Sequence, residues 1–96
     1  MNYLTIAIHY PKPEHRQHIL DAMQKLHGAA QGMPGLVTLG AWLDSSTDRI
    51  IAMSLWETAE QGQAAWGSLI PLIANVPLDT WERQPREVMM QLVRAV

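Results

Sequence analysis

Apolar and polar residues alternate with a period of two in four stretches of the chain, a pattern that predicts β-strands. The most regular pair lies between Leu36 and Trp56, where the polar segment Asp44–Asp48 separates two alternating runs. We expect an antiparallel hairpin there. Similar alternation predicts a first strand at Tyr3–Tyr10 and a last strand at Glu87–Ala95.

Apolar residues at helical spacing occupy the two intervals between these strands. The first helix is expected to begin at Pro13 or Glu14 and to end before the glycine-rich turn at 32–35. Its predicted buried stripe is Ile19, Met23, Leu26 and Ala30. Thr58 should cap the second helix, with Gln61 three residues later, and Pro71 should end its regular part near Ile70. The stripe expected there is Trp66, Leu69, Ile70 and Ile73, followed by a loop at 75–79.

The resulting order, β-α-β-β-α-β, predicts an α+β fold of the ferredoxin-like type. Such a fold has a four-stranded antiparallel sheet with both helices on one face. A chain of 96 residues is expected to form a single domain, residues 1–96.

Both faces of the predicted sheet are apolar, although the helices can cover only one of them. Alternate positions along each strand share a face, and we call each such set a parity. One parity is aliphatic and comprises Leu4, Ile6, Ile8, Val37, Leu39, Leu43, Ile51, Met53 and Leu55. The other parity mixes small and aromatic residues and comprises Tyr3, Ala7, His9, Gly40, Trp42, Ala52, Ser54 and Trp56. We expect the aliphatic face to pack on a second copy in a homodimer, and the small residues to leave a pocket under the helices; the opposite assignment is the alternative. The low charged fraction of 17% also favours a subunit interface.

Composition excludes several classes of function. The net charge is −2 and the basic residues form no run, so nucleic acid is not an expected partner. The absence of cysteine rules out disulfides and thiolate metal sites and suits a reducing cytoplasm, the expected location. Residues 61–78 carry no charge, but glycine and proline interrupt them, so no membrane span is expected.

Two short motifs resemble a known family. The segment from Pro34-Gly35-Leu36 through the hairpin to Trp56-Glu57-Thr58-Ala59 resembles the antibiotic biosynthesis monooxygenase (ABM-type) domain of the dimeric α/β-barrel superfamily. The resemblance implies a ferredoxin-like fold, a homodimer with facing sheets, and a cavity between sheet and helices. It also implies oxygenation of phenolic rings without metal or flavin.

This sequence departs from the family at the polar positions. Members that oxygenate polycyclic phenols accompany the signature Trp, here Trp56, with an Asn four residues earlier and a Tyr six later; Ala52 and Gly62 stand there. Members that degrade haem place an Asn and a His where Ala7 and Val76 stand. The resemblance therefore argues against haem degradation.

The candidate catalytic residues are His9, as proton acceptor or as hydrogen-bond partner of the substrate, and Trp56; no cofactor or metal is expected. An inert His9 at a wet strand end is the alternative. Residues expected to bind the ligand are Trp66, Ala7, Ala52, Trp42 and Ile70. His15 and His18 have a spacing that can bind a metal, but no carboxylate completes such a site, and a solvated helix start is the preferred interpretation.

These observations predict a cofactor-independent monooxygenase that acts on a hydrophobic aromatic small molecule such as a quinol or an anthrone. The alternative is a non-catalytic binding or assembly module with the same dimeric fold. Oxygen consumption with a panel of such rings would separate the two.

Overall fold

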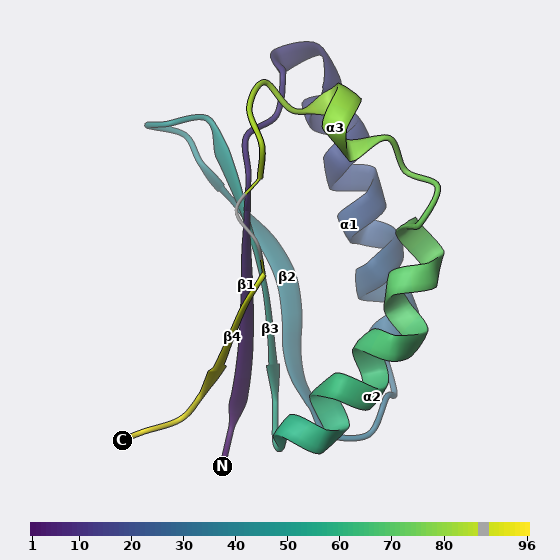
Figure 1. Ribbon diagram of the computed structural model, residues 1–96, viewed down its shortest axis with the longest axis vertical. Coiled ribbons are helices and arrows are strands. Elements are labelled where there is room, and N and C mark those ends of the chain that lie inside the picture. Colours follow the sequence, from purple (N-terminus) through teal and green to yellow (C-terminus); the bar gives the residue numbers. More distant parts are fainter. Residues whose placement is uncertain (87–88) are drawn as a thin grey trace.

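The structure is a computed structural model that describes residues 1–86 and 89–96, and it consists of one sheet with a layer of helices on one face (Figure 1). The strands β1 (Tyr3–His9), β2 (Leu36–Asp44), β3 (Arg49–Trp56) and β4 (Met90–Val93) pair antiparallel in the order β2-β3-β1-β4. The helices are α1 (Arg16–Ala30), α2 (Ala59–Leu69) and the short α3 (Leu78–Trp81). This architecture confirms the predicted α+β ferredoxin-like fold.

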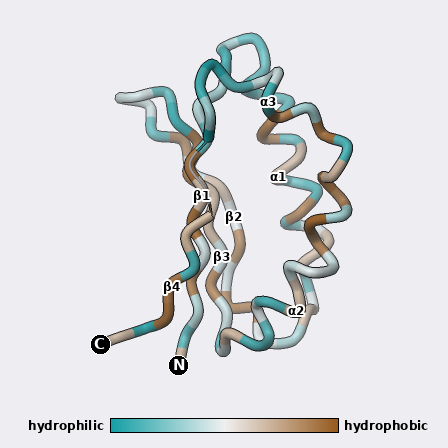
Figure 2. Tube along the Cα trace, in the orientation of Figure 1, coloured by the Kyte–Doolittle hydropathy of each residue, from teal (hydrophilic) through white to brown (hydrophobic). Residues whose placement is uncertain are grey.

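Helix α1 forms as its apolar spacing predicts. A 3₁₀ turn over Pro13–His15 leads into it, and the four residues of the expected stripe are all buried against the sheet and α2. The turn that follows requires two residues in the left-handed region, and glycine occupies both: Gly32 has φ +83° and Gly35 has φ +81°. Figure 2 shows hydrophobic and hydrophilic residues alternating along this helix layer.

Helix α2 begins at the expected cap, since the Thr58 side chain accepts a hydrogen bond of 3.2 Å from the backbone N–H of Gln61. It ends at Leu69, and a 3₁₀ turn that contains Pro71 follows over Ile70–Ile73. The predicted stripe is correct at Leu69 and wrong at Ile70, whose side chain is 54% exposed. The buried side of α2 is set by Gly62, Ala65 and Leu69.

Strand pairing identifies the sheet face that the helices cover. Directly paired residues of antiparallel strands share a face. On β1 and β3 the small-and-aromatic parity is buried under the helices, as expected: Tyr3, Thr5, His9, Ser54 and Trp56. On this point the expected assignment of faces is right.

On β2 the expected assignment is wrong. Leu39 pairs with Ser54 and therefore lies under the helices, whereas Trp42 pairs with Ile51 and lies on the open face. The reason is the turn, which pairs Asp44 with Arg49 and so places odd positions of β2 beside even positions of β3. The same register moves Leu43 to the helix side and Gly40 to the open face.

The C-terminal segment differs from the prediction in two further ways. The expected loop at 75–79 is wrong in its last residues, because α3 begins at Leu78. The last strand covers only Met90–Val93 and ends before Ala95; the predicted positions Glu87 and Val88 lie outside the described residues. The N–H of Arg83 bonds the carbonyl of Tyr10 at 2.8 Å, which fixes the segment after α3 beside the end of β1.

Candidate functional site

A cavity of about 490 Å³ lies between the sheet and the helix layer. Its floor is formed by Ala7 and Ala52, which pair across β1 and β3 and whose methyl groups leave the space open. Met23 and Leu26 of α1 and Trp66 of α2 form apolar walls. Three of the five expected ligand-binding residues, Ala7, Ala52 and Trp66, therefore line one cavity, and His9 lies at its polar end.

His9 is buried and paired with a carboxylate that sequence reasoning missed. Its Nδ1 lies 2.9 Å from Oε1 of Glu82, and the exposed fractions of the two residues are 4% and 5%. The same Oε1 accepts the backbone N–H of Tyr10 at 3.2 Å, which holds the carboxylate in place. Glu82 acts only as an acceptor when ionised, so Nδ1 carries the proton and Nε2 presents its lone pair.

Electrostatics keep this imidazole neutral. Burial lowers the pKa of His9 below its ordinary value of 6.5; the Glu82 carboxylate offsets part of this effect by charge and hydrogen bonding, and the charge of Arg86 adds to it. A neutral imidazole oriented by Glu82 in this way can accept a proton. This arrangement is that of a general base with an orienting carboxylate.

A second ion pair lies at the same end of the cavity. Nη1 of Arg86 is 3.0 Å from Oδ1 of Asp79 and 3.5 Å from Oε2 of Glu82. Both Arg86 and Asp79 line the cavity. The polar end thus combines a neutral base, a buried carboxylate and a guanidinium.

The hydroxyl of Ser54 fixes both tryptophans of the helix side. Its oxygen accepts the indole N–H of Trp56 at 2.8 Å and that of Trp66 at 3.2 Å. With both lone pairs occupied, Ser54 donates its own proton to the hydroxyl of Thr5. Trp66 is thereby held as a cavity wall.

The other predicted site residues lie elsewhere. Trp56 has no exposed surface, and it is not among the described residues that line the cavity. Trp42 lies on the open sheet face and Ile70 points to solvent, with exposed fractions of 50% and 54%. The structure does not bring these three into contact with the cavity.

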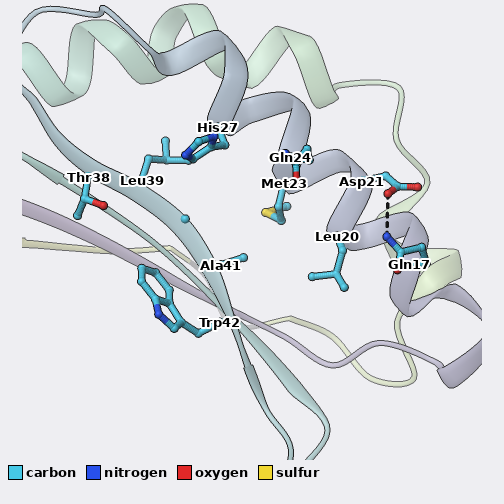
Figure 3. Close-up of a pocket in the computed structure, with 11 residues that line it drawn as sticks. Gln17, Leu20, Asp21, Met23, Gln24, His27, Thr38, Leu39, Ala41 and Trp42 are labelled. Carbon is cyan, nitrogen blue, oxygen red and sulfur yellow. Dashed lines mark hydrogen bonds between the residues drawn. The ribbon is translucent and has the colours of Figure 1, made fainter.

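A second hollow, a groove of about 540 Å³, lies between α1 and the edge strand β2 (Figure 3). Leu20 and Met23 point from α1 toward Ala41, while Gln17 and Asp21 hydrogen-bond each other at its rim. Met23 also lines the inner cavity and so stands between the two spaces. The groove contains no buried acid–base pair among the described residues, so the inner cavity is the better candidate site.

The two histidines at the start of α1 form an aromatic cluster. Nδ1 of His15 lies 3.0 Å from Nδ1 of His18, and both rings lie against Trp81. Within residues 1–86 and 89–96, no group of three or more His, Cys, Asp or Glu side chains could hold a metal ion.

Comparison with known proteins identifies the fold. No protein-family model matches the chain, and no curated protein matches it. Among solved structures, Rv0793 from Mycobacterium tuberculosis is similar with a TM-score of 0.82 and 11% identity, over 100% of this chain and 97% of that one. A protein from Chloroflexus aurantiacus, whose name assigns it provisionally to the antibiotic biosynthesis monooxygenases, is similar with a TM-score of 0.71 and 18% identity, over 100% and 95%.

A third structure, named antibiotic biosynthesis monooxygenase, has a TM-score of 0.69 and 15% identity, over 98% of this chain and 99% of that one. The chain has the ABM-type fold. In the part that the structure describes, no helix of this chain is long and apolar enough to cross a membrane.

Local packing gives a reason for one of the departures from the ABM-type pattern that the sequence resembles. A Cβ atom added at Gly62 would lie 2.4 Å from Cδ2 of Tyr3 and 3.0 Å from Cδ1 of Trp56. The Tyr3 ring therefore fills the space that a side chain at position 62 would need. The other departure, Ala52, forms part of the cavity floor.

Proposed function

We propose that this ABM-type domain binds a hydrophobic, ring-containing small molecule in the inner cavity and oxygenates it with O2. The observation that carries the proposal is the His9–Glu82 pair, a buried neutral base at the polar end of an apolar space. The apolar walls can hold a hydrophobic ring, and the base can remove the proton that activates that ring.

The chemistry is that of a ring with an acidic hydrogen, for which an anthrone is the simplest example. Nε2 of His9 takes the proton, and Glu82 stabilises the imidazolium that forms. The resulting carbanion gives its electrons to O2, and a C–O bond forms. The imidazolium of His9 then returns its proton to the peroxide anion, which gives a hydroperoxide and regenerates the base. Loss of water from the hydroperoxide converts CH2 into C=O, so that one oxygen atom enters the product and the other leaves as water. The substrate supplies all the electrons, and no further reductant is needed.

The open face of the sheet supports a homodimer as part of this proposal. Leu4, Ile6 and Ile8 point away from the helices, and the exposed fractions of Trp42 and Leu92 are 50% and 44%. An apolar surface of this kind is costly to leave in water. We infer that a second copy covers it, with the two sheets facing each other.

Light scattering after gel filtration tests the dimer. Ile6 lies between Met53 and Met90 near the centre of the open face, so Ile6→Glu should convert a dimer into a monomer. A wild-type monomer at micromolar concentration would contradict the inference, whereas a monomer seen only for the variant supports it.

Oxygen uptake with a panel of anthrones and quinols tests the activity. Wild type should consume one O2 for each ketone formed, and His9→Ala should lower kcat by roughly 10²–10⁴-fold. His27→Ala is the matched control, because His27 is exposed on α1 and does not line the inner cavity. Binding of the panel without oxygen uptake would instead support the alternative, a non-catalytic binding module.

A further inference from the structure

Arg86 has unused hydrogen-bonding capacity at the polar end of the cavity. Both of its contacts, to Asp79 at 3.0 Å and to Glu82 at 3.5 Å, are made through Nη1. A guanidinium carries five N–H donors in a planar fork. Within the described part of the chain, Nε and Nη2 have no hydrogen-bond partner.

The two carboxylates beside Arg86 differ in how firmly they are held. The Glu82 side chain is 2% exposed and is hydrogen-bonded to His9 and to the backbone N–H of Tyr10, so it is held firmly in the polar end of the cavity. The Asp79 side chain is 97% exposed, and its only hydrogen bond among the described residues is the one to Arg86. An exposed ion pair of this kind contributes little to stability and can exchange its partner readily.

We propose that Arg86 anchors an anionic oxygen of the ligand and that Asp79 is an internal counter-ion which this anion displaces. The inference rests on the proposed cavity and specifies its ligand class: a flat apolar ring that bears a carboxylate or a similar anionic oxygen. The ring lies over Ala7 and Ala52 against Trp66, and the anion lies at the guanidinium. Arg86 is thus a specificity-determining residue.

Exchange of Asp79 for a ligand carboxylate leaves the total charge at this end of the cavity unchanged. With Asp79 in place, Asp79, Glu82 and Arg86 sum to one negative charge; once Asp79 turns into water, Glu82 and Arg86 cancel. An incoming carboxylate then meets a planar fork that it can bind with two oxygens, the geometry that favours Arg over Lys. Asp79 competes with that carboxylate, so its removal should strengthen binding of acids and leave neutral rings unaffected.

A pair of ligands of nearly equal shape tests this inference. Binding of 2-naphthoate and of 2-naphthamide is measured by tryptophan fluorescence, with wild type, Arg86→Gln, Asp79→Asn and the control Arg94→Gln. Arg94 is exposed beyond β4 and bonds only Val96 and Asn2 among the described residues. Since a charged hydrogen bond is stronger than a neutral one by about a factor of two, naphthoate should bind wild type about 10-fold more tightly than naphthamide.

The preference should vanish in Arg86→Gln, increase roughly 3-fold in Asp79→Asn, and stay unchanged in Arg94→Gln. Equal binding of the two ligands to wild type, or an unchanged preference in Arg86→Gln, overturns the inference, and so does failure of both ligands to bind. The measurement needs no turnover. A protein that prefers naphthoate but consumes no oxygen refutes only the oxygenase function, and a protein that oxygenates neutral anthrones without preferring naphthoate refutes only the anion site.

Discussion

Replacing Glu82 with Gln removes the charge of the carboxylate that orients His9 while keeping the size of the side chain. The amide oxygen can still accept from Nδ1 of His9 and from the backbone N–H of Tyr10, so the tautomer should be preserved. A hydrogen bond to a charged partner contributes about 1.5–3 kcal/mol and a neutral one about 0.5–1.5 kcal/mol. The imidazolium should therefore lose about 1–1.5 kcal/mol of stabilisation, which corresponds to a fall in kcat/KM of about 5–10-fold.

The same substitution should also shift the pH dependence of the reaction, in a direction set by the effect of Glu82 on the pKa of His9. Glu82 raises the pKa of His9 and thereby offsets part of the effect of burial, so its neutralisation should lower that pKa further. The imidazole then stays neutral to a lower pH, and the acid limb of the rate profile should move to lower pH. Titration of the His9 ring by NMR measures the same shift without a substrate.

The control for this substitution is Glu60→Gln, which neutralises an exposed carboxylate in the first turn of α2. It should leave both the His9 titration and the rate unchanged. A Glu82→Gln protein that is folded but shows the wild-type pKa for His9 would refute the assigned role of Glu82. The carboxylate would then only hold the chain after α3 in place.

Three further predictions concern packing, and thermal or urea unfolding checks the first two. Gly62→Ala should lower the free energy of unfolding by about 1–3 kcal/mol, because the added methyl collides with the Tyr3 ring. The control Gly67→Ala, whose added methyl meets nothing within 4 Å, should raise the free energy of unfolding by up to about 1 kcal/mol. Equal effects of the two substitutions would contradict the close contact between Gly62 and Tyr3. Ser54→Ala should cost about 2–4 kcal/mol because it leaves two indole N–H groups without their acceptor, and a neutral result would show that water replaces the hydroxyl. Ala52→Leu places a larger side chain on the cavity floor and should weaken binding of the naphthyl ligands more than about 10-fold, because the ring loses its apolar contact with that floor. Calorimetry that finds an unchanged affinity would show that the ligand binds elsewhere.

The element order and most of the core were predictable from sequence because they depend on local periodicity. The stripe of α1, the cap at Thr58 and the small-and-aromatic parity of β1 and β3 all follow from residues close together in the chain. The faces of β2 were not predictable in this way. Their assignment depends on the pairing of Asp44 with Arg49, and alternation along one strand contains no information about its register with the next.

The candidate site was predictable in its apolar residues and in His9, but not in the charged groups beside His9. His9, Ala7 and Ala52 share a strand parity that the sequence displays, and they do line the same cavity with Trp66. Glu82 was missed because it lies in a charged segment that resembles an ordinary solvated connection. A short helix after a proline, Leu78–Trp81, brings it to the end of β1, and no periodic signal marks a helix of that length.

The partners in the His9–Glu82 pair are 73 positions apart in the chain. Pairing over such a separation closes a long loop, and contacts of this kind form late in folding. His9 is synthesised before Glu82, so the hairpin and α1 can begin to assemble around it first. Until Glu82 has been made, the imidazole of His9 therefore lacks the carboxylate that orients it.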